Sequence, residues 1–260
     1  TPQMKTVLVI GASGFIGSNV VHHFKSRNNR VIAAFNKNII RYPGVSTFCY
    51  NFNARETFKR ALSLFKPDII IYCAGMTDFL ECAKHPRMAE TANSVGPVVL
   101  SGAAESLSHR FIYLSTCFVY DGSKGNFSDN DVILAETVFG KTKTAGENYV
   151  RSKSLTHTIL RFSPIYGMGS IYHASEFDRI RMRLERGKTV ELADNEYHSF
   201  LSIEIALKAI EWVATTETKN RTYNLGGLTK LSWYEFGLRV AESFGFNPSL
   251  VVPTKGQFES

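Results

Sequence analysis

A glycine-rich segment directly after the first apolar run constrains the fold more than any other feature of the sequence. The run over residues 5–10 is followed by Gly11, Gly14 and Gly17, in a G-x-x-G-x-x-G spacing. Gly11 permits a tight turn, Gly14 lets the backbone approach a phosphate, and Gly17 allows a helix to pack closely on a strand. The helix that follows offers unpaired N–H groups and a positive dipole end to phosphates. The order of strand, loop and helix therefore predicts dinucleotide binding.

Short apolar runs alternate with helix-like segments over the first 160 residues. The runs are rich in Val, Ile and aromatic residues, which indicates strands buried on both faces. Strand and helix repeated in this way predict a parallel sheet with right-handed crossovers, that is, an α/β fold with a Rossmann-like doubly wound sheet. The predicted strands cover residues 5–10, 31–35, 46–50, 68–73, 110–115 and 157–162, and the predicted helices cover 15–27, 54–65, 87–106 and 138–152.

The regular alternation of strand-like and helix-like segments ends at about Ser163, where the segment SPIYGMGS contains glycine and proline. Helices are expected over residues 176–186 and 203–215, with a short strand over 189–192 between them. A further helix is expected to begin after Ser232, whose side chain is a suitable N-cap. We therefore predict a nucleotide-binding domain over residues 1–162 and a smaller substrate-binding lobe over 163–260. The chain is free to return to the sheet between the two.

Composition limits the classes of partner. No apolar run approaches the ~20 residues that a membrane span needs, and the N-terminal segment reads as a strand rather than a signal peptide. The four cysteines form no C-x-x-C pair, which favours free thiols in the cytoplasm. The net charge of +7 suits anionic ligands, but the basic residues are too scattered for a nucleic-acid face. The histidines share no metal-ligand spacing, so no metal is expected.

The end of the second strand bears on the choice of cofactor. An Asp or Glu there accepts hydrogen bonds from the ribose hydroxyls of NAD. This chain instead has Asn36 and Lys37, with Arg41 nearby. A carboxylate would repel a 2′-phosphate, whereas lysine and arginine pair with one. NADP(H) is therefore favoured over NAD(H), the alternative being that Lys37 is only a solvated loop residue.

Several linked motifs resemble those of the extended short-chain dehydrogenase/reductase family, in the correct order along nearly the whole chain. These are IIIYCAGMTD, TANSVGP, LSTCFVYDG, FGKTKTAGE, LRFSPIYG and YNLGG. They are most similar to the motifs of the dTDP-4-dehydrorhamnose reductases. By this resemblance Thr116 occupies the catalytic Ser/Thr position, Lys143 the catalytic lysine position, and Asn93 the position of an asparagine that braces the active site.

The resemblance implies an NADP-dependent reductase of a nucleotide-activated 4-keto-6-deoxy sugar, with a homodimer as the expected assembly. In the second lobe, His198 and three arginines are candidates to meet the substrate diphosphate, although Arg179, Arg181 and Arg183 also fit a solvated helix face. Glu204 stands where the family often has an acidic residue. The predicted cofactor contacts are Gly11, Ser13, Gly14, Phe15, Ile16, Gly17, Asn36, Lys37, Asn51, Phe52, Cys73, Ala74, Gly75, Lys143 and Phe162.

Four features depart from the family pattern. Asn51 replaces a carboxylate common near the adenine, and Cys117 follows Thr116 where the reductases carry Asp. The dehydratase relatives have acidic residues here, so Cys117 argues against dehydration. The chain ends at PTKGQFES, short of the usual C-terminal segment. The fourth departure is Phe139, at the position of the catalytic tyrosine.

Phe139 decides what chemistry the site can perform. In the family the tyrosine hydroxyl exchanges the proton with the carbonyl oxygen, and the lysine at i+4 lies on the same helix face. Phenylalanine has no proton to give, and general acid catalysis is commonly worth ~10²–10⁴-fold. Three explanations stay open. Phe139 is an engineered substitution in an active reductase, or it is natural in a silent NADP-binding regulatory or scaffold protein, or another acid replaces tyrosine. The candidate acids are Tyr120, Tyr166, Asp121 and Cys117.

Overall fold

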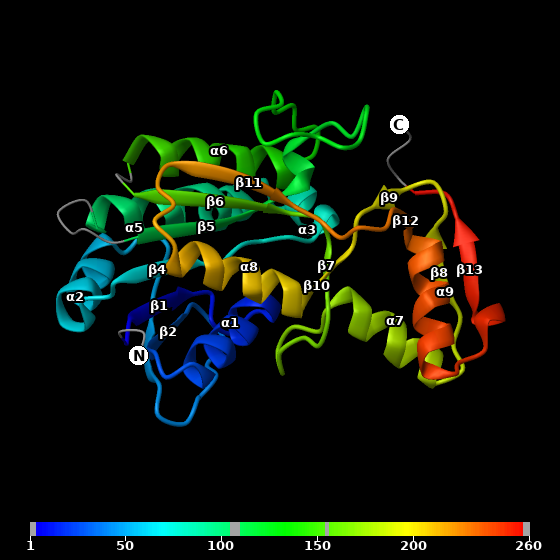
Figure 1. Cartoon of the computed structure of the whole chain (residues 1–260), viewed down its shortest axis with the longest axis horizontal. Helices are drawn as coiled ribbons and strands as arrows, with labels where there is room; N and C mark the ends of the chain where they lie inside the picture. Colours follow the sequence, from blue (N-terminus) through cyan, green and yellow to red (C-terminus); the bar gives the residue numbers. More distant parts are fainter. Residues whose placement is uncertain (1–3, 105–109, 154–155, 257–260) are drawn as a thin grey trace.

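A seven-stranded parallel sheet forms the centre of the molecule. The structure is a computed structural model that describes residues 4–104, 110–153 and 156–256. Within these ranges the strand order is β11-β6-β5-β4-β1-β2-β3, and every pair is parallel (Figure 1). The order reverses beside β1, which confirms the predicted doubly wound α/β fold. The strands are β1 (Thr6–Ile10), β2 (Arg30–Phe35), β3 (Ser46–Cys49), β4 (Ile69–Tyr72), β5 (Arg110–Thr116), β6 (His157–Phe162) and β11 (Arg221–Leu225).

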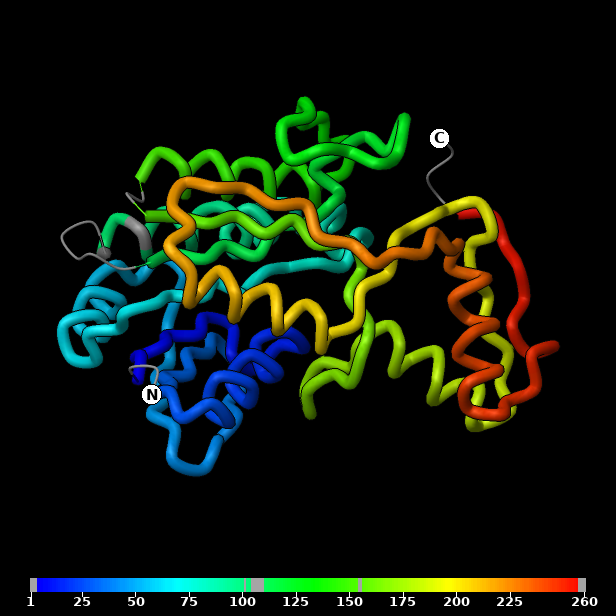
Figure 2. Tube along the Cα trace, viewed as in Figure 1, coloured from blue at the N-terminus to red at the C-terminus, as the bar shows by residue number. Residues whose placement is uncertain are grey.

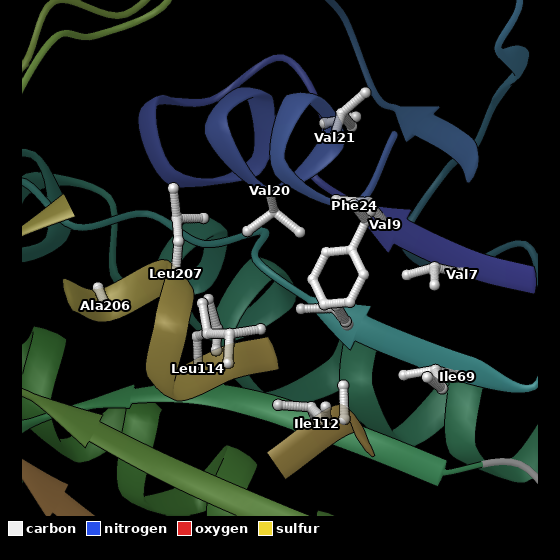
Figure 3. Close-up of a cluster of buried hydrophobic side chains, with 14 of the residues drawn as sticks. Val7, Val9, Val20, Val21, Phe24, Ile69, Ile112, Leu114, Ala206 and Leu207 are labelled. Carbon is white, nitrogen blue, oxygen red and sulfur yellow. The ribbon is translucent and has the colours of Figure 1, made fainter. Parts of the chain in front are cut away.

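Two layers of helices cover the sheet. Val7 and Val9 of β1 face α1 and α8, and Figure 3 labels Val20 and Leu207 among the side chains of this layer. Leu8 lies in the cluster on the opposite face, which packs against α2, α5 and α6. Burial on both faces explains why the strands are almost continuously apolar. The helices are α1 (Phe15–Ser26), α2 (Arg55–Phe65), α5 (Gly96–Ala104), α6 (Val138–Lys153) and α8 (Ile203–Thr215).

The helix predicted over residues 87–106 is interrupted by a π-helical turn, η1. Pro97 has no N–H to donate to the carbonyl of Asn93, four residues earlier. The hydroxyl of Tyr113 donates to that carbonyl oxygen at 2.7 Å instead. π-turns are rare, and they occur mostly as single turns inside α-helices, often at functional sites. Ser106 lies outside the described residues. The elements around this turn are α3 (Phe79–Lys84), α4 (Pro86–Glu90) and η1 (Thr91–Val95).

The elements after residue 163 divide between the sheet and a second hydrophobic cluster. Figure 2 shows the chain leaving the sheet after β6, returning through α8 and β11, and leaving again towards α9 (Trp233–Phe244). The second cluster centres on Ile180, Leu192, Phe236 and Val240. β11 is a strand of the sheet and α8 packs against the sheet, so the chain returns to it within residues 163–260. The division at residue 162 into two lobes stays a prediction.

The last helix begins as the sequence predicts. The hydroxyl of Ser232 accepts from the Glu235 N–H at 3.1 Å, and the Glu235 carboxylate accepts from the Ser232 N–H at 2.7 Å. This reciprocal pair is a capping box, and it confirms Ser232 as the N-cap. The remaining elements are η2 (Cys117–Val119), β7 (Ile165–Tyr166), α7 (Glu176–Glu185), β8 (Val190–Ala193), β9 (Tyr197–His198), β10 (Leu201–Ser202), β12 (Leu231–Ser232), α9 (Trp233–Phe244), η3 (Pro248–Leu250) and β13 (Val251–Thr254).

Among the described residues, no helix combines the length and the apolarity that crossing a membrane requires.

Candidate functional site

The predicted site residues gather at one edge of the sheet. The strands run in parallel, so the segments that follow β1, β2, β4 and β5 meet at the carboxyl edge. In doubly wound sheets ligands bind at this edge, where the strand order reverses. Thr116 ends β5 and pairs in register with Phe162 at the end of β6. Phe162 is buried in the main hydrophobic cluster, beneath this edge.

The glycine loop is packed so tightly that side chains would not fit. Gly11 has a φ of +81°, and a Cβ there would lie 2.6 Å from the backbone nitrogen of Ala74. A Cβ on Gly17 would collide with the carbonyl oxygen of Gly11. Gly14 is the N-cap of α1 and no side chain caps the helix there. The amides at the start of α1, at Phe15 and Ile16, therefore have no side-chain cap and suit an anion.

The loop over residues 36–45, after β2, is held by two hydrogen bonds and carries two exposed cations. The Asn36 side-chain amide donates to the Tyr50 carbonyl oxygen at 3.0 Å, and the Tyr42 hydroxyl donates to the Ala12 carbonyl oxygen at 2.6 Å. Lys37 and Arg41 are exposed. The two cations are therefore available to an anionic ligand beside the glycine loop.

Asn51 and Phe52 follow β3 and are oriented by their neighbours. The Asn51 side-chain oxygen accepts from the Asn53 N–H at 3.0 Å, so it closes a local turn. The Phe52 ring meets the Tyr50 ring edge-on, with 5.2 Å between centroids. A role for either residue at an adenine ring stays a prediction.

Asn93 braces the segment that follows β4. Its side-chain oxygen accepts from the Met76 N–H at 3.0 Å, and its amide donates to the Met76 carbonyl and to Thr142 Oγ1, each at 3.0 Å. Asn93 is fully buried. A Cβ on Gly75 would lie 2.7 Å from the Asn93 oxygen and 3.5 Å from Lys143 Nζ. Cys73 precedes this turn, and burial raises the pKa of its thiol to about 12.

Lys143 projects from α6 to the end of β5. Its amine donates to the Leu114 carbonyl oxygen at 2.7 Å and lies 4.7 Å from the centroid of the Tyr113 ring. The side chain is almost completely buried, and this burial lowers the pKa of the amine to about 8, although Cys73 and Glu147 partly oppose the shift. The amine is therefore protonated in most molecules at neutral pH.

Phe139 lies one helical turn before Lys143, inside an aromatic cluster. Its ring meets that of Phe79 edge-on at 5.4 Å, and the Phe118 centroid lies 6.1 Å away. The Phe139 side chain is buried with Cys82 and Ala89. The position of the family tyrosine is therefore filled by an apolar ring.

Thr116 and Cys117 lie at the turn after β5. Thr116 is buried, its hydroxyl oxygen accepts from the Phe118 N–H at 3.3 Å, and its side chain also hydrogen-bonds with Cys117. Burial raises the pKa of the Cys117 thiol to about 11, against hydrogen bonds with Ser163 and Thr116.

A buried ion pair behind Lys143 is a feature that our sequence reasoning missed. Glu147 is fully buried and accepts from Arg161 Nε at 2.9 Å and Nη2 at 2.7 Å. The Ser115 hydroxyl donates to the same carboxylate at 2.6 Å. A signal was present in the sequence, because Arg161 is the one arginine in the apolar run HTILRF. An arginine inside a buried strand requires an anionic partner.

The second-lobe candidates differ in their surroundings. His198 is ringed by Phe118, Phe200 and Trp233, with centroid separations of 5.5, 5.7 and 5.8 Å, and burial lowers the pKa of its imidazole to about 4. Glu204 is exposed on α8. The three arginines of α7 bond locally: Arg179 with Glu176, Arg181 with Glu185, and Arg183 with the Thr189 carbonyl. Arg179 and Arg183 are exposed and Arg181 is half-buried, and contact with a substrate diphosphate stays a prediction.

Comparison with known proteins relates the whole chain to one family. Residues 4–259 match the RmlD substrate binding domain. The chain is 24% identical to a dTDP-4-keto-6-deoxy-D-glucose reductase of Streptomyces niveus, over 95% of this chain and 81% of that protein. It is 23% identical to the methionine adenosyltransferase 2 subunit beta of Xenopus laevis, over 97% of this chain and 76% of the relative.

The fold resembles that of a solved enzyme. The crystal structure of a dTDP-4-dehydrorhamnose reductase from Bacillus anthracis, in complex with NADP, superposes with a TM-score of 0.83. The sequences are 17% identical, and the match covers 98% of this chain and 85% of the other. At this identity the likeness shows a shared fold.

Proposed function

The chain belongs to the RmlD substrate binding domain family, and on that premise we propose that it is an NADP(H)-dependent reductase of a nucleotide-activated 4-keto-6-deoxy sugar, slowed by Phe139. One observation carries the proposal: the buried amine of Lys143 is fixed on the Leu114 carbonyl, at the end of the strand that presents Thr116. The relative named as a dTDP-4-keto-6-deoxy-D-glucose reductase supports the substrate class.

The residues of the carboxyl edge fit a nicotinamide dinucleotide. Side chains at Gly11 and Gly75 would clash with Ala74 and Asn93, so both positions require glycine. Without side chains, the backbone at these positions can lie close to a bound cofactor. The uncapped start of α1 suits the pyrophosphate. Lys37 and Arg41 suit a 2′-phosphate, which favours NADP(H) over NAD(H).

The nicotinamide supplies a hydride to the sugar carbonyl carbon when it is bound. The hydroxyl of Thr116 donates a hydrogen bond to the carbonyl oxygen and stabilises the negative charge that develops there. The Lys143 ammonium adds positive charge at the same edge of the sheet. Phe139 cannot complete the reaction by giving a proton to that oxygen, so transfer is slow.

The four candidate acids are not equivalent in the structure. The Tyr120 hydroxyl is engaged with Arg161 at 2.6 Å and with Asn224 at 3.0 Å. Tyr166 packs on the Phe236 ring of the second cluster. Hydrogen bonds from Ser123 lower the pKa of the Asp121 carboxyl, so at neutral pH it has no proton to give. Cys117 keeps its proton and directly follows Thr116, which makes its thiol the better candidate for residual activity.

The test compares NADPH oxidation by the unchanged chain with that of Phe139→Tyr and Cys117→Ala. The substrates are dTDP- and UDP-linked 4-keto-6-deoxy sugars. We expect slow oxidation by the unchanged chain and a ~10²–10⁴-fold faster rate for Phe139→Tyr, because the general acid is restored. A further loss of rate in Cys117→Ala would identify the thiol as the residual donor.

Two results would reject the reductase proposal, and they differ. If NADPH binds but neither the chain nor Phe139→Tyr reduces any sugar, a silent binding protein is the better description. If titration detects no binding of NADP(H) or NAD(H), the cofactor assignment itself fails.

A further inference from the structure

A turn between β7 and α7 reaches across to the glycine loop. We call residues 168–175 the strap. The Ser170 N–H donates to the His173 carbonyl oxygen at 3.0 Å, which closes the turn. The Gly169 N–H donates at 2.6 Å, and the Ser175 N–H at 3.0 Å, to the carboxylate of Asp178 in the first turn of α7. The base of the strap is therefore fixed to α7.

The tip of the strap binds the glycine loop and the start of α1. The Ser170 hydroxyl donates to the carbonyl oxygen of Ser13 at 2.6 Å. The side-chain amide of Asn19, on α1, donates to the Met168 carbonyl oxygen at 3.0 Å. Ser13 and Ser170 are separated by 157 positions in the chain. In Figure 1 the segment before α7 lies near the start of α1.

The strap also binds the loop over residues 36–45. The Tyr172 hydroxyl donates to the Ile39 carbonyl oxygen at 2.9 Å, and the Asn38 amide lies 3.2 Å from His173 Nε2. The same loop is tied to the glycine loop by the bond from Tyr42 to Ala12. Each of these three segments is thus hydrogen-bonded to the other two. We call the strap, the glycine loop and the 36–45 loop together the frame.

The frame leaves the anion-binding groups available. Ser170 bonds to a backbone carbonyl of the glycine loop, and no side chain caps the start of α1, so the amides of Phe15 and Ile16 are not consumed by a cap. Lys37 and Arg41, on the loop that Tyr172 holds, are exposed cations. The strap's hydrogen bonds therefore use neither these amides nor the two cations, which stay available to a phosphate.

We infer that the strap clamps the phosphate-bearing half of the dinucleotide, and that Ser170 and Tyr172 are residues that retain the cofactor. This inference rests on the proposed function, since it takes NADP(H) as the ligand. For the ligand to leave, the strap must first release Ser13 and Ile39. Loss of either hydrogen bond therefore speeds release.

The experiment measures NADPH dissociation by stopped-flow fluorescence after mixing the complex with excess NADP⁺. The variants are Ser170→Ala and Tyr172→Phe, each of which removes one hydroxyl and leaves the backbone intact. We expect the dissociation rate to rise about three- to tenfold in each, as one net hydrogen bond predicts. Ser249→Ala, which removes an exposed serine hydroxyl in η3, is the matched control and should release NADPH at the unchanged rate.

The outcomes separate the clamp from the proposed function. NADPH binding with the same dissociation rate in all four proteins overturns the clamp and leaves the reductase proposal intact. Absence of NADPH binding to the unchanged chain overturns both. Thermal unfolding of each variant establishes that it is folded, and the conservative Tyr172→Phe change decides the matter if Ser170→Ala proves unstable.

Discussion

The carboxylate of Glu147 accepts two hydrogen bonds from the guanidinium of Arg161, at 2.9 and 2.7 Å, with both side chains almost completely withdrawn from water. Glu147 stands on α6 one turn after Lys143, and Arg161 stands on β6. The pair therefore fixes α6 to the sheet close to the candidate site. The negative charge of Glu147 also favours the protonated form of Lys143.

Replacing Arg161 with methionine should lower the free energy of unfolding by about 3–5 kcal/mol, because Glu147 would remain buried without its main partner. Denaturant unfolding measures this. Arg179→Met, at an exposed pair with Glu176 on α7, is the control and should cost no more than about 1 kcal/mol. Equal effects of the two changes would show that the buried pair contributes nothing specific.

Much of the fold was predictable because burial on two faces leaves a plain pattern in the sequence. The apolar runs at 5–10, 68–73 and 157–162 correspond to strands of the sheet, and the family match confirms the resemblance inferred from the motifs. The interruption at η1 was not predicted. It depends on the Tyr113 hydroxyl satisfying the Asn93 carbonyl, a contact between segments that no local pattern displays.

The site was predictable where the chain's own geometry dictates it and not elsewhere. Gly11 could be placed from the glycine spacing, because a tight turn after a strand is a local property. Lys143 was assigned through the family resemblance, and the i+4 spacing then put it on one helix face with residue 139. The bond from Ser170 to Ser13 joins loops far apart in sequence, and loop conformation is set by tertiary contacts. The Phe118–His198 contact also depends on how η2 meets β9.

The surroundings of His198 should make stability depend on pH in the acidic range. Burial lowers the pKa of this imidazole from 6.5 to about 4, so between those values the unfolded chain binds more protons than the folded one. Stability from this group is therefore full above pH 6.5 and is lost as the pH falls towards 4. His198→Phe keeps a ring against Trp233 and should show a flatter pH dependence in unfolding measurements. A pKa near 6.5 for the His198 imidazole itself, measured by NMR in the folded protein, would contradict this.

Lys143 should produce a second pH dependence, at alkaline pH. Burial lowers the pKa of its amine from 10.5 to about 8, a penalty of about 3 kcal/mol for keeping the charge buried at neutral pH. Between pH 8 and 10.5 the unfolded chain binds more protons, so the contribution of this group to stability rises with pH over that window. Lys143→Met has no such group, and its advantage over the unchanged chain in free energy of unfolding should shrink between pH 8 and 10. Measuring the difference between the two proteins cancels the titration of cysteines and tyrosines common to both.

Activity restored by a tyrosine at position 139 should require Lys143. The two positions are one turn apart on α6, and a lysine ammonium beside a phenol favours the phenolate that proton transfer produces. In a double-mutant cycle, Phe139→Tyr should accelerate NADPH-dependent reduction by ~10²–10⁴-fold in the unchanged background. In a Lys143→Met background the gain should be at least tenfold smaller, since the phenol then lacks its neighbouring charge. Cofactor affinity, measured separately by fluorescence titration, distinguishes this coupling from a simple loss of binding. Additive effects in the cycle would mean that the hydroxyl acts without the lysine, and the pairing of the two positions on one helix face would then have no chemical consequence.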